Sequence, residues 1–137
     1  SDTWDSNVVV DAAAGQNITI YVSTFYQEGG SPEFDAGFKA WINSDSVHLA
    51  NNNGNDMISA VSAMGYDAYM VALEALKAAG SKDPKAVNTA LWDVKYDGVT
   101  GAIAFDETGD AIRDVAFIKH LDTANSAWEL AAVQGKD

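Results

Sequence analysis

Residues 56–84 read DMISAVSAMGYDAYMVALEALKAAGSKDP, the longest run of regularly spaced apolar side chains in the chain. The apolar positions recur at steps of three and four residues, which is the spacing of one face of a helix. Asn55 or Asp56 is suited to cap the start, and Gly80 lies where a helix commonly ends, with Pro84 just beyond. The sequence therefore predicts a long helix between residues 56 and 80.

This helix has little polar surface. In its second half only Asp67, Glu74 and Lys77 are polar, and they fall on one narrow side. We therefore expect a core helix of an α/β domain that is buried except for that edge. The apolar side is formed by Met57, Ile58, Val61, Met64, Tyr66, Ala68, Tyr69, Val71, Ala72, Leu73, Leu76 and Ala79.

The composition excludes several classes of protein. The 137 residues are enough for one domain with a core, and the formal net charge of −12 repels nucleic acid and anionic membrane surfaces. The chain has no cysteine, so disulfide bonds and thiolate metal sites are excluded. No apolar run approaches the ~20 residues of a membrane-spanning helix.

Signals for further helices and strands flank the long helix. β-branched and aromatic residues predict a strand at 17–26 that is buried on both faces. Pro32 and Pro84 take the first positions of two shorter helices, which Ser31 and Asp83 cap. Further expectations are a short helix at 8–14, a polar loop at 43–55, strands at 98–105, 111–121 and 127–133, and turns at 106–110 and 122–126.

This order of elements is incomplete for a free-standing doubly wound sheet, which needs several parallel strands with helices between them. Here one buried strand precedes the helices, and three strands follow in meander order. We therefore expect the chain to be the C-terminal part of a larger α/β protein.

The sequence offers little catalytic chemistry. His48 lies in a polar loop and His120 at the end of a strand, and neither has a carboxylate at metal-ligand spacing on a common helix. The stretches 51–56 and 106–110 lack the ligand pattern of a calcium loop, so we interpret them as a helix cap and a hairpin turn. We expect no catalytic residue, no metal and no cofactor.

The N-terminal stretch SDTWDSN, residues 1–7, is the strongest candidate for ligand binding. It places Asp2, Thr3, Trp4 and Asp5 just before the short helix. A carboxylate there can pair with a ligand's ammonium group, and the indole can cover an apolar or cationic part of the ligand. The alternative interpretation is a solvated end of the chain with Trp4 packed on the sheet.

Four segments of the sequence together resemble a known family. They are TWDS (3–6), GYDAY (65–69), EALKAAGSKDPKAVNTAL (74–91) and YDGVTGAIAFDETGD (96–110). Their order and spacing are similar to those of the type I solute-binding proteins of branched-chain amino acid (Leu/Ile/Val) ABC transporters, over nearly the whole chain. The last segment begins YDGVTG where that family usually has F-x-GVTG.

The resemblance implies an α/β fold of two Rossmann-like lobes joined by crossing strands, with antiparallel strands towards the C-terminus. The chain then supplies a C-terminal fragment of such a protein. Residues 1–21 are part of the second lobe, 22–110 are a crossing strand with the first-lobe helices, and 111–137 are strands that return to the second lobe.

The resemblance also implies a set of ligand contacts. The family's carboxylate for the ligand ammonium corresponds best to Asp2 and second to Asp5, with Thr3 beside them and Trp4 lining the cleft. Ala63 corresponds to a position that often carries a large side chain over the ligand's tail. The small alanine implies a wider pocket or a different ligand.

The function implied in this way is that of an ABC importer component without enzymatic activity. It captures a branched-chain or related amino acid by lobe closure and delivers it to a membrane permease, with no nucleic-acid partner. The implied location is the periplasm or the cell exterior, and a membrane anchor preceding Ser1 is one alternative. The fold leaves two other roles open, which are the ligand-sensing domain of a receptor and a binding protein for amides, urea or aromatic acids. Alone, the fragment is expected to expose apolar faces and to form a homo-oligomer, with exchanged elements as one form.

Overall fold

The computed structural model describes residues 2–135. Its helices are the 3-10 turn η1 (Asp2–Trp4), α1 (Asn7–Ala13), α2 (Pro32–Ile42), α3 (Ser46–Asn51), α4 (Ala60–Ala79) and α5 (Pro84–Leu91). Its strands are β1 (Tyr21–Thr24), β2 (Tyr96–Gly98), β3 (Gly101–Ile103), β4 (Val115–Asp122) and β5 (Ala127–Gly135).

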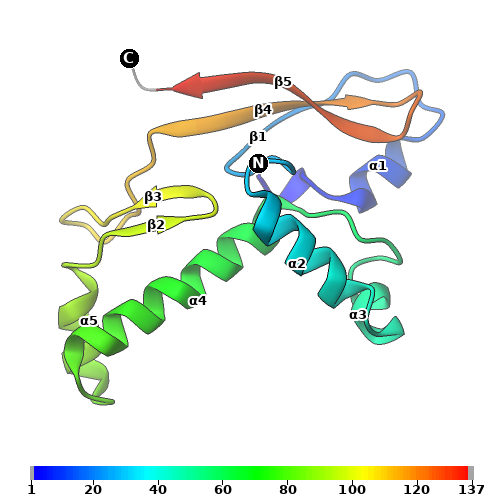
Figure 1. The fold of residues 1–137 in the computed structure, drawn as a ribbon. Coiled ribbons are helices and arrows are strands. Elements are labelled where there is room, and N and C mark those ends of the chain that lie inside the picture. The colour runs from blue at the N-terminus through cyan, green and yellow to red at the C-terminus, as the bar shows by residue number, and fades with distance from the viewer. Residues whose placement is uncertain (1, 136–137) are drawn as a thin grey trace.

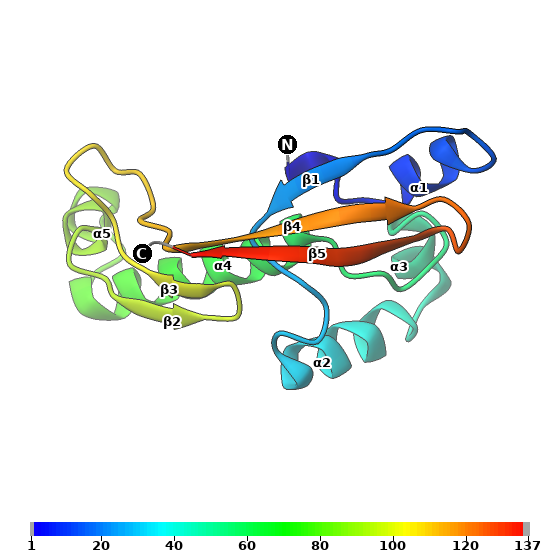
Figure 2. The same ribbon diagram turned by 90° about the horizontal axis from the view of Figure 1, so that it is seen from above.

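The elements form two groups, which we call the sheet group and the helical group. The sheet group contains the antiparallel sheet β1-β4-β5 together with η1 and α1. The helical group contains α2 to α5 and the hairpin β2–β3. Figure 1 shows α4 starting under the sheet and running away from it towards α5 and the hairpin. Seen from above in Figure 2, the three strands lie side by side, and α1 lies beyond β1.

Strand β1 differs from the prediction in length and burial. The predicted strand 17–26 is ordered as a strand only at Tyr21–Thr24, where Val22 and Thr24 are buried while Tyr21 and Ser23 are exposed. The predicted burial on both faces is therefore wrong for this structure. The physical reason is that β1 is an edge strand paired only with β4, and the described elements cover only one face of the sheet.

Helix α4 starts later than predicted and ends as predicted. Its N-cap is Ser59, whose side chain accepts a hydrogen bond from the Ser62 amide, and its C-cap Gly80 has the left-handed φ of 57°. The residues before Ser59 stay out of the helix because the side chain of Asn52 donates to the carbonyls of Asn55 and Met57. Local side-chain bonds of this kind compete with helix formation.

The buried side of α4 is not the side that the sequence predicted. Asp67, expected on the solvated edge, is 1 % exposed and accepts hydrogen bonds from the amides of Val99 and Thr100 and from the Thr100 hydroxyl. Apolar side chains expected in the core are exposed instead, namely Val61, Tyr66, Tyr69 and Leu76. The helix packs its small-residue side, Ala60, Ala63, Val71 and Ala75, against the rest of the chain.

The second half of the chain contains more turns than predicted. The expected strand 98–105 is replaced by the hairpin β2–β3, in which Tyr96 pairs with Ile103 and Gly98 with Gly101. The two amides that donate to Asp67 lie in the turn of this hairpin, which explains why the chain reverses there.

The expected loop 43–55 also contains α3, which the Asp45 side chain caps by accepting from the Val47 amide.

The other predicted elements are confirmed with shifted ends. They are α1, α2, α5, β4, β5 and the turn at 106–110, where Gly109 has a φ of 89°. Three small clusters of buried residues support them, centred on Tyr26 and Ala63, on Val71 and Ile103, and on Val10 and Leu121. Within residues 2–135, no helix combines the length and apolar character needed to cross a membrane.

The contact between Asp67 and the hairpin gives a stability prediction. A Cβ atom at Gly98 would lie 2.5 Å from an Asp67 carboxylate oxygen, so Gly98→Ala is expected to destabilise the fold by about 1–3 kcal/mol in urea unfolding. Gly65→Ala is the matched control, because a Cβ there meets nothing within 4 Å and alanine stabilises a helix interior by about 0.5–1 kcal/mol. Equal effects of the two changes would show that the Asp67 contact does not hold the hairpin.

Candidate functional site

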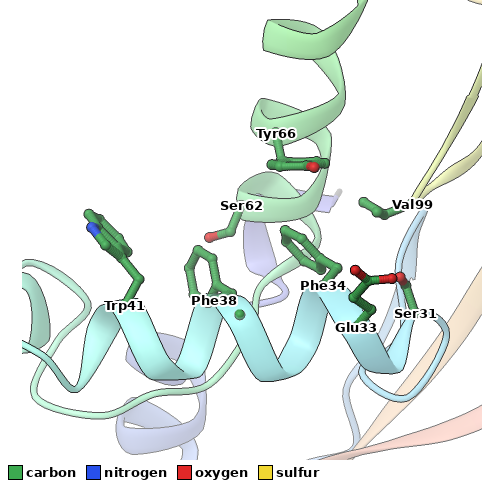
Figure 3. A pocket seen from close by; sticks show the side chains of 9 residues that line it. Ser31, Glu33, Phe34, Phe38, Trp41, Ser62, Tyr66 and Val99 are labelled. Carbon is green, nitrogen blue, oxygen red and sulfur yellow. The ribbon is translucent and has the colours of Figure 1, made fainter.

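A groove lies between α2 and α4. Its volume is about 680 Å³, and Figure 3 shows the side chains that line it. Phe34, Phe38 and Trp41 project from α2 on one side, and Ser62 and Tyr66 from the first turns of α4 on the other. Ser31, Glu33, Gly37 and Val99 complete the lining.

Aromatic rings form a continuous row along the groove. The centroid distance is 5.1 Å between Phe34 and Tyr66, 5.7 Å between Phe34 and Phe38, and 6.0 Å between Phe38 and Trp41. Such tilted ring pairs are favourable beyond the apolar area that they bury. The row arises because three aromatic residues of α2 are spaced four and three residues apart and so lie on one helix face.

A buried hydrogen-bond cluster positions the start of α2. The Tyr26 hydroxyl donates to one Asp35 oxygen at 2.5 Å, and the Gly29 amide donates to the other at 2.6 Å. The Tyr26 oxygen in turn accepts from the Ser31 amide at 3.2 Å. Burial raises the pKa of Tyr26 well above its ordinary value, and the hydrogen bond to the Asp35 carboxylate raises it further.

The groove is suited to an apolar body with a few polar contacts. Its volume falls in the range of about 300–1,000 Å³ that is typical of small-molecule sites. The polar groups of its lining residues include the hydroxyls of Ser31, Ser62 and Tyr66 and the Glu33 carboxylate. Trp41 is exposed and Phe34 and Phe38 are only half-buried, so the aromatic face of α2 is open here.

The structure separates the N-terminal candidate residues from this groove. Asp5 is 2 % exposed, and its carboxylate accepts from the Lys119 ammonium group at 2.8 and 3.0 Å. Thr3 and Trp4 are exposed, whereas the side chain of Asp2 lies outside the described part of the structure. A ligand contact for any of these four residues stays a prediction.

The structure does bring Asp5 to the start of α4. The Ala60 amide donates to the Asp5 carboxylate at 3.3 Å. Ala60 precedes Ala63 by three residues and lies on the same side of the helix. Ala63 itself is fully buried between Tyr26, Ile58 and Ala60, while its neighbour Ser62 lines the groove. Its contact with a ligand also stays a prediction.

Two features of the site were not found from the sequence. The aromatic row of α2 has the spacing of one helix face, and this spacing alone does not distinguish a core face from an open groove. Lys119 was not singled out, although it is the only Lys or Arg of β4 and follows the apolar run VAFI. An ionisable residue at an inward position of a strand is the signal that indicates a buried partner.

Comparisons with known proteins agree with this fold. Residues 4–125 match the family model described as periplasmic binding protein. A leucine binding protein, LivK, from Thermotoga maritima superposes with a TM-score of 0.74 at 25% sequence identity, covering 99% of this chain and 36% of that one. A solute binding protein of an ABC transporter from R. palustris, solved in complex with benzoate, superposes with a TM-score of 0.64 at 16% sequence identity. The superposition covers 93% of this chain and 33% of that one.

A curated relative is similar over a shorter stretch. It is the metabotropic glutamate receptor-like protein E of Dictyostelium discoideum, 34% identical over an alignment of 89 residues, with a coverage of 59% of this chain and 11% of that protein. The chain thus spans about a third of the two solved structures and about a tenth of the curated relative.

The buried Tyr26 hydroxyl gives a pH-dependent prediction. Tyr26→Phe removes the bonds to Asp35 and Ser31 and is expected to lower the free energy of unfolding by about 1–3 kcal/mol at neutral pH. Because the folded-state pKa is raised, the contribution of Tyr26 is complete below the ordinary tyrosine pKa of 10.0 and declines as the pH rises above it. The deficit of the variant, measured by urea unfolding across this range, should therefore shrink at alkaline pH. A deficit that stays constant would contradict the buried hydrogen bond.

Proposed function

Because the chain belongs to the periplasmic binding protein family, we propose that it works outside the cytoplasm as part of the solute-binding component of an ABC importer. The observation that carries this proposal is the superposition of 99% of the chain on a leucine binding protein, together with the family match over residues 4–125. The importer's membrane permease is then the protein partner. The proposed mechanism is reversible capture of a solute by closure of two lobes, with no covalent step.

In this proposal the chain supplies pieces of both lobes. We assign residues 1–21 to the second lobe, 22–110 to a crossing strand with first-lobe helices, and 111–137 to strands that return to the second lobe. The division into a sheet group and a helical group is consistent with this assignment, because the chain passes between the groups at 25–31 and 104–114.

The proposed solute is a branched-chain or related amino acid. Its ammonium group pairs with a carboxylate of the N-terminal segment, and we assign this contact to Asp2 because Asp5 is already paired with Lys119. Trp4 is exposed and can cover the apolar part of the solute, with Thr3 beside it. Ala63 leaves room over the solute's tail in this proposal.

Two other roles on the same fold have specific support. The similarity to a metabotropic glutamate receptor-like protein favours a ligand-sensing domain of a receptor. The benzoate complex of the R. palustris protein, a relative at the level of fold, favours an aromatic acid as the solute, and the aromatic row of the groove between α2 and α4 has matching chemistry.

Calorimetric titration separates these roles. Leucine, isoleucine, valine, glutamate and benzoate are titrated into the 137-residue chain and, in parallel, into the whole polypeptide that its gene encodes. We expect no saturable binding to the 137-residue chain, since it corresponds to about a third of the solved relatives. We expect the whole polypeptide to bind one of the aliphatic amino acids, and Asp2→Asn to weaken that binding about 10- to 100-fold.

The matched control is Asp11→Asn on the exposed side of α1, which is expected to leave affinity unchanged. Binding of glutamate alone favours the receptor role, and binding of benzoate alone favours the aromatic acid. Lack of binding for every solute by the whole polypeptide would sink the solute-binding proposal.

We also propose that the 137-residue chain forms a homo-oligomer, with exchange of elements as one form. The supporting observation is a row of exposed apolar side chains along α4, formed by Val61, Tyr66, Tyr69 and Leu76. Apolar patches of this kind on soluble proteins commonly mark an interaction surface.

Sedimentation velocity measures this association. We expect a dimer or larger species, and Tyr69→Glu is expected to shift the equilibrium towards monomer at least about tenfold, because a carboxylate in an apolar interface is costly. Val47→Glu on α3 is the control, since Val47 is similarly exposed but lies on another helix. A stable monomer at all concentrations, or equal effects of the two changes, would refute the proposed interface.

A further inference from the structure

The ion pair between Asp5 and Lys119 is buried at the junction of the two groups. The side chains are 114 residues apart in sequence, and their shortest contact is 2.8 Å. Asp5 is 2 % and Lys119 3 % exposed, so neither charge is screened by water to a useful extent.

The Asp5 carboxylate collects donors from several elements. Besides the Lys119 ammonium of β4, it accepts from the Thr24 hydroxyl of β1 and from the Ala60 amide at the start of α4, both at 3.3 Å. Asp5 itself lies between η1 and α1. One side chain therefore ties the N-terminal segment, two strands of the sheet and the first residue of the long helix together.

These donors stabilise the charged carboxylate of Asp5 in its buried position. Lys119 supplies a full positive charge. The first turn of α4 supplies the Ala60 amide, which has no acceptor within the helix, and the positive end of the helix dipole. Removing one charge of such a pair leaves the other buried without compensation, which is far more costly than removing both.

Asp67 provides an internal comparison. It is equally buried, but its direct donors are two amides and one hydroxyl, all from Val99 and Thr100 within the helical group. Asp67 therefore holds one group together, whereas Asp5 links the sheet group to the helical group.

Two stretches of the chain also connect the sheet group to the helical group. Between β1 and α2 the chain runs through residues 25–31, and between β3 and β4 through 104–114. Residues 25–31 form a loop, and residues 104–114 form a loop with an isolated bridge between Phe105 and Ala111.

We propose that the Asp5–Lys119 pair is a fixed joint between the two groups. The pair keeps the start of α4 on the sheet in every arrangement of the groups. Lys119 is a positioning residue in this scheme. Its ammonium group fills the cationic position at Asp5 and so keeps this carboxylate from serving as a ligand contact.

The first test is a cycle of the variants Asp5→Asn, Lys119→Met and the double variant. Lys119→Met leaves a buried unpaired carboxylate and is expected to lower the thermal midpoint by roughly 10 °C or more. The double variant buries no charge and should recover at least about half of that loss. Losses that simply add in the double variant would overturn the joint, and the double variant keeps the test readable if Lys119→Met fails to fold.

Amide hydrogen exchange adds a readout that a general loss of stability would not move. The Ala60 amide donates to Asp5, whereas the Val99 and Thr100 amides donate to Asp67. In the double variant we expect the protection of Ala60 to fall at least about tenfold while Val99 and Thr100 keep theirs. Equal losses at all three amides would overturn the proposal.

Chemical rescue tests the cationic position itself. Lys119→Ala removes the ammonium group together with the three carbons beyond Cβ, and n-propylammonium chloride has the size and charge to replace them. We expect it to raise the midpoint of Lys119→Ala, with no rise from sodium chloride at equal ionic strength. The variant Asp5→Asn with Lys119→Ala should gain nothing, and an equal gain there would contradict the pairing.

Distances between spin labels test whether the joint is fixed. The chain has no cysteine, so two cysteines that carry the labels can be introduced at chosen positions. Labels at positions 8 on α1 and 61 at the start of α4 flank the joint, and labels at 8 and 92 just beyond α5 lie far from it. We expect a narrow distance distribution for the first pair and a wider one for the second, with the first pair widening in the Asp5→Asn and Lys119→Met double variant. A first pair as wide as the second in the parent chain would refute the fixed joint.

Discussion

A carboxylate removed from water must be surrounded by donors, and this constraint at Asp5 organises the whole structure. Its donors come from Lys119 in β4, Thr24 in β1 and Ala60 at the start of α4. The sheet and the long helix therefore meet the N-terminal segment at this point, each through a donor to the same carboxylate. The same constraint at Asp67 fixes the hairpin β2–β3 against the middle of α4.

Between these two polar anchors, the apolar surface is only partly covered. The small-residue side of α4 packs inward, while Tyr66 and Tyr69 face outward, Tyr69 with 64 % of its surface exposed. Aromatic side chains, among them Phe34, Phe38 and Tyr66, line the groove between α2 and α4. This exposure is consistent with a chain that spans about a third of its solved relatives, since the apolar sides of helices in α/β folds normally rest on a sheet.

Local signals were predictable because their physics is local. The left-handed Gly80, the Asp83 cap and Pro84 at the first position of α5 act within one helical turn, and each was located from the sequence. The family was also recognisable, because its segments keep their order and spacing along the chain. The start of α4 was missed because Asn52 bonds to the following carbonyls, an interaction that the apolar periodicity does not reveal.

By itself, the sequence determined most of the helices and strands and the family, since these depend on residue types at short spacings. The tertiary structure alone decided that Asp5 is paired with Lys119 and that Asp67 is buried. Asp5 and Lys119 are 114 residues apart, and a carboxylate in sequence looks the same whether it meets water, a ligand or a lysine. The long helix is therefore oriented by the few polar groups that it must satisfy, whereas its abundant apolar surface could have faced either way.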